Sequence, residues 1–108
     1  MPQYLYQAAY TPESLAAQMK NPADRLAQVG EMVAKSVGAK ILAGGFSYGD
    51  YDIAVILEAD SNTTAAAIAV AIASGGAVKS AKTTPLLSGD EWIETLKQAS
   101  SVTYTPAK

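Results

Sequence analysis

Tyrosine or alanine occupies every second position from Tyr4 to Tyr10, and this period of two predicts a β-strand over Gln3–Tyr10. Successive side chains would face opposite sides of a sheet, with Tyr4, Tyr6, Ala8 and Tyr10 on one side and Gln3, Leu5, Gln7 and Ala9 on the other. Both sides are partly apolar, which is typical of a central strand. Further strands are predicted over residues 40–48, 51–58 and 77–84.

Apolar residues at helical spacing, together with capping residues, predict the helices. A first short helix begins at Thr11-Pro12-Glu13, and the chain breaks near Asn21. A longer helix over residues 22–36 carries an apolar stripe of Leu26, Val29, Val33 and Val37. An alanine-rich helix follows over residues 62–74, and a capping box at Ser88 starts a last helix that ends near Ser100.

The glycines predict where the backbone turns sharply. Gly38 would end the second helix as a left-handed cap. Gly44-Gly45 lies inside a predicted strand, which indicates a bulge or a close approach by another backbone or a ligand. Gly49 and Asp50 lie between two strands, so they are expected at the tip of a β-hairpin.

The resulting element order is β-α-β-β-α-β with an added helix, within one domain over residues 1–108. This order predicts an α+β, ferredoxin-like fold with a four-stranded antiparallel sheet in the order 4-1-3-2 and both helices on one face. The other face would be half apolar, with Leu5, Ala9, Ala54 and Ile56 beside Gln7, Asp52 and Glu58. Such a face needs cover, and a second copy of the chain would supply it in a twofold dimer of the dimeric α/β-barrel type. Trp92 and Ile93 would pack against the domain or its dimer mate.

Composition removes several classes of function. The net charge is −2 and the basic residues are scattered, so nucleic acid is not an expected partner. Histidine and cysteine are absent, which removes their usual roles in catalysis and metal binding, and we expect no metal and no cofactor. No signal peptide is expected, and the apolar run over residues 65–73 is too short to cross a membrane, so a cytoplasmic protein with no membrane partner is expected.

The hairpin is one place where chemistry could reside. Tyr48, Asp50, Tyr51 and Asp52 concentrate phenols and carboxylates there. Two carboxylates separated by one residue on a strand would lie on the same face of the sheet. They could act as an acid/base pair or bind a hard cation. The favoured interpretation is a turn with solvated carboxylates.

A second group joins Gln7 to Lys82 and Thr83 on the neighbouring strand. These side chains could converge beside Tyr6 or Tyr10 to hold a small anion or a carbonyl compound. The favoured interpretation is an ordinary edge-strand surface. The tyrosine set Tyr4, Tyr6, Tyr10, Tyr48 and Tyr51 could line a pocket, although packing is the favoured role.

Several of these features together resemble the GYD-domain family. They are the Gly49-Asp50-Tyr51 tripeptide, Tyr4 and Tyr10-Thr11 in the first strand, the alanine-rich helix after Asp60 and the segment 82–87, within a similarity over about residues 3–98. The family is bacterial and archaeal and is similar in pattern to dimeric α/β-barrel proteins. The resemblance implies the fold and no established reaction.

The expected function is therefore a homodimeric module that binds a small, hydrophobic molecule between sheet and helices or at the dimer face. The candidate ligand-binding residues are Gln7, Tyr48, Asp50, Asp52, Lys82 and Thr83. One alternative is a cofactor-independent enzyme of the oxygenase or isomerase type that uses Asp50, Asp52 or Tyr48 for proton transfer. Another is a structural domain that builds homo-oligomers.

Overall fold

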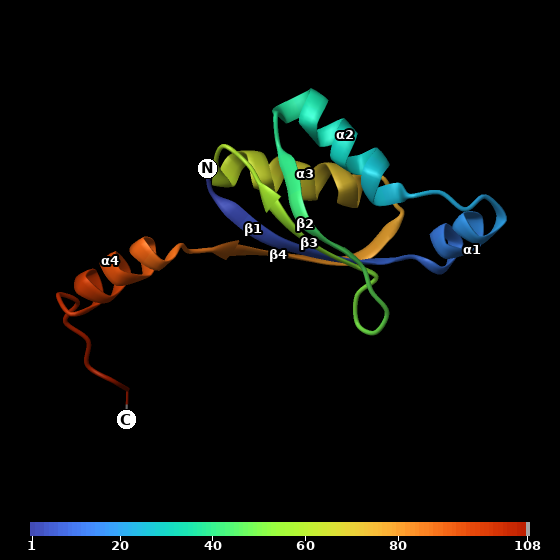
Figure 1. Ribbon diagram of the computed structural model, residues 1–108. Helices are drawn as coiled ribbons and strands as arrows, with labels where there is room; N and C mark the ends of the chain where they lie inside the picture. Colours follow the sequence, from blue (N-terminus) through green and yellow to red (C-terminus); the bar gives the residue numbers. More distant parts are fainter. Residues whose placement is uncertain (108) are drawn as a thin grey trace.

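The computed structural model describes residues 1–107 and forms one antiparallel sheet with two helices on one face (Figure 1). The sheet order β2-β3-β1-β4 is the predicted 4-1-3-2 order read from the other edge, so the ferredoxin-like α+β fold is confirmed. The elements are β1 (Gln3–Tyr10), α1 (Pro12–Lys20), α2 (Arg25–Val37), β2 (Lys40–Phe46), β3 (Ile53–Glu58), α3 (Asn62–Ser74), β4 (Val78–Leu86) and α4 (Gly89–Ala99).

Helix ends follow the capping residues. The side chains of Thr11, Asp24, Ser61 and Ser88 each accept a hydrogen bond from the backbone N–H three residues later. Helix α2 begins at Arg25 instead of Pro22, because Asp24 is the cap. Gly38 ends α2 in the left-handed conformation, as predicted, with φ of 67°.

The strand ends differ from prediction in two places. β2 stops at Phe46 and β3 starts at Ile53, so residues 47–52 form a loop that is wider than the predicted tight turn. In Figure 1 this loop projects away from the sheet on the side opposite α2 and α3. β4 continues through Pro85 to Leu86. Proline has no backbone N–H to donate, but β4 is an edge strand and has a neighbouring strand on one side only, so the sheet tolerates proline there.

The strand register assigns each side chain to a face. Tyr4, Tyr6 and Tyr10 lie on the face toward the helices, where they are buried. Leu5 pairs with Ile56 on the opposite face, which we call the open face because no helix within residues 1–107 covers it (Figure 1). Leu5 and Ile56 are half-buried, whereas Ala9, which was expected to be open as well, is buried.

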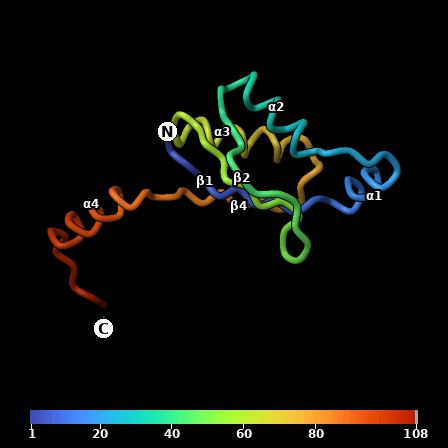
Figure 2. The backbone as a smooth tube through the Cα atoms, in the orientation of Figure 1, coloured from blue at the N-terminus to red at the C-terminus, as the bar shows by residue number. Residues whose placement is uncertain are grey.

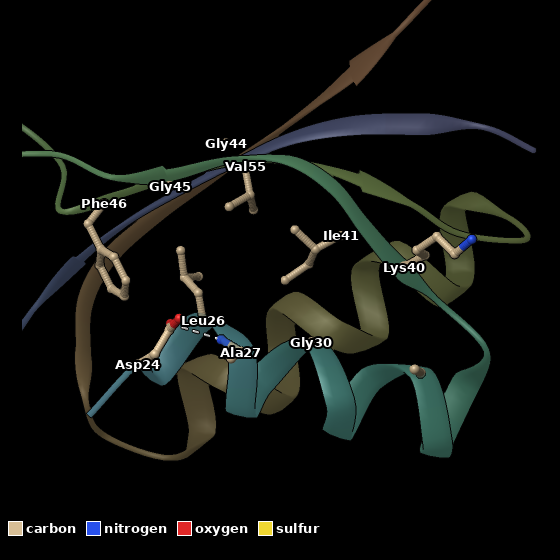
Figure 3. A pocket seen from close by; sticks show the side chains of 11 residues that line it. Asp24, Leu26, Ala27, Gly30, Lys40, Ile41, Gly44, Gly45, Phe46 and Val55 are labelled. Carbon is tan, nitrogen blue, oxygen red and sulfur yellow. Dashed lines mark hydrogen bonds between the residues drawn. The ribbon is translucent and has the colours of Figure 1, made fainter.

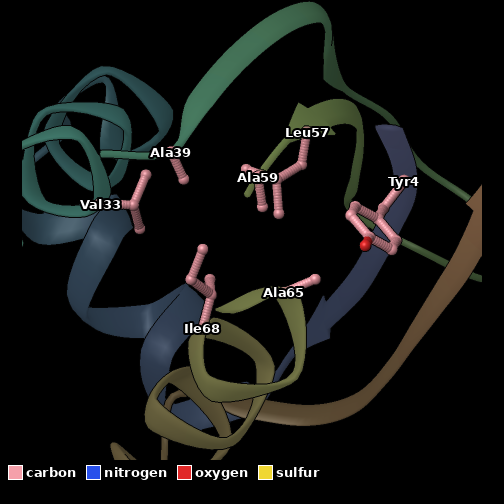
Figure 4. Packing of buried hydrophobic residues seen from close by; sticks show 7 residues of the cluster. All are labelled: Tyr4, Val33, Ala39, Leu57, Ala59, Ala65 and Ile68. Carbon is pink, nitrogen blue, oxygen red and sulfur yellow. The ribbon is translucent and has the colours of Figure 1, made fainter. Parts of the chain in front are cut away.

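The core lies between the sheet and the two helices. Side chains from α2, β3, α3 and β1 point toward one another there, as Figure 4 shows for Val33, Leu57, Ile68 and Tyr4. A second cluster, Tyr6, Ala8, Tyr10, Ile53 and Val55, continues along β1 and β3. The predicted apolar stripe of α2 is only partly buried in the core, because Val33 is its one buried residue.

Gly44 is a position where the backbone requires glycine. Its φ is 109°, and a Cβ there would fall against Ala54 O and 2.6 Å from Val55 Cα. The β2–β3 register also shifts between Ile41 and Ala43. Both features confirm the predicted bulge and close backbone approach in this strand.

Helix α4 lies away from the rest of the chain. Figure 2 shows it beyond the end of β4, and its residues are all exposed. The radius of gyration is 17.1 Å, against about 13 Å for a compact domain of about 100 residues. The prediction that Trp92 and Ile93 could fold against their own domain is therefore wrong, since each is 53% exposed. No helix within residues 1–107 is long and apolar enough to cross a membrane.

Candidate functional site

A cavity of about 550 Å³ lies between α2, α3 and the sheet; we call it the helix-side cavity. Its wall is almost entirely aliphatic. Helix α2 contributes Leu26, Val29, Met32, Val33 and Val37, helix α3 contributes Ala67, Ile68, Ala71 and Ile72, and the sheet contributes Tyr6, Tyr10, Ile41, Ile53, Val55, Leu57 and Val78. Its volume and apolar lining are those of a small-molecule pocket.

The sequence explains why space remains here. Helix α3 presents alanines at positions 67 and 71, and their short side chains do not reach α2. The larger side chains of α2 therefore stay partly uncovered, with Met32 50% and Val37 37% exposed. Fully burying such a side chain is worth about 1.5–3 kcal/mol, so an apolar ligand in this space would recover stabilisation that the chain alone leaves unused.

Three tyrosines of β1 face the helices, and their hydroxyls differ in whether they have a hydrogen-bond partner. The Tyr4 hydroxyl donates a hydrogen bond to Oδ1 of Asn62, the first residue of α3, at 2.7 Å. The hydroxyls of Tyr6 and Tyr10 are buried and have no hydrogen-bond partner among residues 1–107. A buried polar group without a partner costs about 1–3 kcal/mol. Tyr6 and Tyr10, and not Tyr4, belong to the cavity wall.

Burial raises the pKa of the Tyr6 phenol above its ordinary value, and the nearby Tyr10 adds to the rise. Burial also raises the pKa of Tyr10. Two charges modify it: Arg25 lowers the Tyr10 pKa, and Asp52 raises it by a smaller amount. Both phenols therefore keep their protons at neutral pH and are available as hydrogen-bond donors.

Arg25 is the first residue of α2 and lines the helix-side cavity. Its position follows from the N-cap Asp24, the residue directly before the helix. The side chain is exposed, and Nη1 donates to Gln28 Oε1 at 3.0 Å. A guanidinium has five N–H donors, so most remain for another partner.

A second hollow of about 460 Å³ lies between α2 and β2 (Figure 3). Leu26, Ile41 and Val55 border both this hollow and the helix-side cavity, so the two spaces are neighbours. Figure 3 shows Leu26 and Ile41 pointing into the hollow, while the Asp24 carboxylate is engaged with the Ala27 N–H. The glycines Gly44 and Gly45 form its roof on β2.

The hairpin residues Tyr48, Asp50 and Asp52 lie in the loop between β2 and β3 and not on a common strand. Tyr48 is 98% exposed, and Asp50 is also exposed in the loop. The Asp52 carboxylate instead accepts a hydrogen bond from the Tyr10 N–H at 2.9 Å. Residues 50 and 52 lie outside the strands, so the expected alignment of two carboxylates on one strand is wrong. No cluster of three or more His, Cys, Asp or Glu within residues 1–107 is placed to hold a metal ion.

The second group divides between the two faces of the sheet. Gln7 pairs directly with Lys82 on the open face. Thr83 pairs with Tyr6, so it lies on the helix side. Gln7 and Lys82 are therefore neighbours, as predicted, but they lie on the far side of β1 from Tyr6 and Tyr10. None of the six candidate residues lines the helix-side cavity.

Arg25 was not among the predicted site residues, and packing was the favoured role of Tyr6 and Tyr10, with the lining of a pocket as the alternative. A signal was available for the tyrosines: three phenols on one face of a central strand need three partners. The helices that would cover them carry few polar side chains at apolar-stripe positions. For Arg25 the sequence gives only its place after a helix cap, which does not indicate what the side chain faces.

The comparisons with known proteins give one match. The family model described as GYD domain matches residues 4–96. No curated protein and no solved structure matches the chain. The matched segment extends from β1 into α4 and so includes the sheet, the helix-side cavity and the hairpin loop. The chain belongs to the GYD domain family.

Proposed function

We propose that this protein is a homodimeric module that binds a small apolar molecule in the helix-side cavity. The observation that carries the proposal is a cavity of about 550 Å³ with an aliphatic wall and two tyrosines, Tyr6 and Tyr10, whose buried hydroxyls are unpartnered within residues 1–107. An aliphatic wall with a few polar groups is the usual composition of a ligand pocket. A ligand would cover the exposed parts of Met32 and Val37 and supply partners for the phenols.

The open face supports self-association. It carries the half-buried pair Leu5 and Ile56 at its centre, together with charges of both signs, including Lys82 and Glu58. A surface with both signs can match its own twofold-related copy, because each lysine can meet a glutamate of the partner. A second copy is thus the partner that this face fits best.

Helix α4 gives independent support for a dimer. It has a full capping box at Ser88, yet Trp92, Ile93 and Leu96 are each 53% exposed. Isolated helices shorter than about 12–15 residues are marginal in water. An amphipathic helix of 11 residues that has no cover in its own chain is therefore expected to gain its stability by packing on the second copy.

Binding to the cavity is tested with Nile red, a neutral dye that fluoresces in apolar surroundings. Ala71 lies exposed on α3 and lines the cavity, so Ala71→Phe fills its mouth without disturbing a buried residue. The matched control is Ala66→Phe, an exposed position on the same helix that does not line the cavity. We expect Ala71→Phe to weaken dye binding at least about tenfold, or about 1.4 kcal/mol, and Ala66→Phe to leave it unchanged. Equal affinity in both variants would refute the cavity as the binding site.

A further inference from the structure

We propose that the ligand of the helix-side cavity is an apolar molecule with a carboxylate at one end, held by the hydroxyls of Tyr6 and Tyr10 and by the guanidinium of Arg25. This inference rests on the proposed function and adds the chemical class of the ligand. The three side chains come from two elements, the centre and end of β1 and the start of α2, and all three line the cavity.

The tyrosines determine which polar group the ligand carries. Each is only 6% exposed, and each hydroxyl lacks a partner in the described part of the chain. A neutral phenol donates its proton more readily than it accepts one, and burial keeps both phenols neutral. The missing group is therefore an acceptor. A carboxylate has two oxygens and about four acceptor positions, so it offers an acceptor to each hydroxyl, and the two phenols are near enough for Tyr10 to raise the pKa of Tyr6.

Arg25 determines the sign of the charge. It is the one charged residue that lines the cavity within residues 1–107. Asp52 also acts on the pKa of Tyr10, in the opposite direction, but Arg25 has the larger effect on that phenol. The Asp52 carboxylate is also occupied by the Tyr10 backbone N–H. A charged lining residue of positive sign, with the larger effect on the Tyr10 phenol, favours an anion over a cation at this end of the cavity.

The aliphatic wall determines the chemistry of the rest of the ligand. Beyond the polar end, the cavity runs between Val29, Met32 and Val37 of α2 and Ala71 of α3. The one hydroxyl beside them, that of Ser36, already donates to Met32 O. A ligand body with several polar groups would therefore be desolvated there without compensation. A hydrocarbon chain or ring fits this part. Because neighbouring side chains cover both hydroxyls, the carboxylate reaches them after a local separation of those side chains.

Tyr4 shows that the chain does not leave phenols unpaired as a rule. It lies on the same strand and face, and it is as buried as the other two, but Asn62 accepts its proton at 2.7 Å. The difference between Tyr4 and the pair Tyr6 and Tyr10 coincides with the cavity, since only the pair lines it. Tyr4 is accordingly the matched internal control for any test of the pair.

The test is displacement of Nile red by three ten-carbon compounds with different ends: decanoate, 1-decanol and decylamine. We expect decanoate to displace the dye at a concentration at least about tenfold below that of decylamine, with 1-decanol between them. Tyr6→Phe, Tyr10→Phe and Arg25→Gln should each reduce the preference for decanoate over 1-decanol at least about threefold. Tyr4→Phe should leave that preference unchanged.

The outcomes separate this inference from the proposed function. If Nile red binds and is sensitive to Ala71→Phe, but the three compounds displace it equally, the cavity binds ligands and the carboxylate assignment is wrong. The assignment is also wrong if a buried water satisfies the hydroxyls, because the Phe variants would then leave the decanoate preference intact. If no compound and no dye binds in the cavity, the proposed function itself fails.

Discussion

The Asp52 carboxylate accepts a hydrogen bond from the backbone N–H of Tyr10 at 2.9 Å, at the point where β1 and β3 cease to pair. The backbone of Asp52 is used as well. Its N–H donates to Ala8 O and its carbonyl accepts from the Ser47 N–H, both at 2.8 Å. Asp52 therefore ties the hairpin loop to the end of β1, next to one of the two cavity tyrosines.

Replacing Asp52 by alanine should lower the free energy of unfolding by about 1.5–3 kcal/mol, the usual worth of a hydrogen bond to a charged group. The Tyr10 N–H would lose its acceptor in a half-buried place. Asp50→Ala is the control, because Asp50 is exposed in the same loop, and it should change stability by less than about 0.5 kcal/mol. Urea unfolding followed by circular dichroism measures both. Equal losses in the two variants would contradict a special role for Asp52.

Removing single hydroxyls from β1 should have opposite effects on stability. Tyr4→Phe loses a hydrogen bond to Asn62 and should cost about 1 kcal/mol. Tyr6→Phe and Tyr10→Phe remove buried hydroxyls that have no partner within residues 1–107, so each should be neutral or should stabilise by up to about 1 kcal/mol. Denaturant unfolding of the ligand-free protein gives the comparison. A loss above 1 kcal/mol in the latter two would mean that a water or another group already satisfies them.

The same two phenols should make the protein sensitive to alkali. Burial raises their pKa values in the folded state above 10.0, the ordinary value of a tyrosine phenol. The folded protein then holds protons that the unfolded chain has released, so this contribution to stability is complete below about pH 10 and is lost as the pH rises through the folded-state values. The double variant with Phe at positions 6 and 10 should lose less stability above pH 10. Parallel curves for the two proteins would be the contrary result.

Adjacent glycines in β2 should differ sharply in their tolerance of a methyl group. Gly44→Ala places Cβ against the backbone of Ala54 and Val55 at a φ of 109°, and it should cost at least about 2 kcal/mol. A Cβ at Gly45 meets nothing within 4 Å, and its φ is not in the left-handed range. Gly45→Ala should therefore be neutral or mildly stabilising. Thermal unfolding of the two variants decides, and similar melting temperatures would disprove the close approach.

A charge in the centre of the open face should break the dimer. Ile56→Lys places an ammonium group beside Leu5, where the second copy would pack. Val70→Lys is the control, because Val70 is 67% exposed on α3 and does not line the helix-side cavity. Light scattering should give a dimer for the parent and for Val70→Lys, and a monomer for Ile56→Lys. The fluorescence of Trp92, the single tryptophan, should shift to the red in the monomer. A parent protein that is already monomeric at micromolar concentration would overturn the dimer.

The sequence predicts most of the fold because the local signals agree with one another. The alternation along β1 assigns its tyrosines to one face, and the caps at Thr11 and Ser88 mark the helix starts. Residues 47–52 show where such signals fail. Tyr48 and Tyr51 are residues of a type that favours strands. The pairing of β1 with β3 nevertheless ends where the Asp52 carboxylate accepts a hydrogen bond from the Tyr10 N–H, a contact between residues 42 positions apart in the sequence.

The cavity could not be predicted in the same way. The apolar stripe of α2 indicates which side of the helix faces the core, but it does not give the distance to α3. That distance depends on how both helices pack on the sheet and on the short side chains at positions 67 and 71. The carboxylates at Asp50 and Asp52 drew attention as titratable groups, whereas the buried, unpartnered groups are phenols, whose lack of partners becomes visible only in three dimensions.

Because side chains alternate along β1, one face of this strand lines the helix-side cavity and the other forms part of the open face. Tyr6 and Tyr10 line the cavity, while Leu5 and Gln7, on either side of Tyr6 in the chain, lie on the open face. A slip of one residue exchanges the two sides of a strand. Deleting a single residue between Tyr6 and Tyr10 would thus place the two phenols on opposite faces of the sheet, so the spacing of this strand is under a tighter constraint than the identity of any one of its side chains.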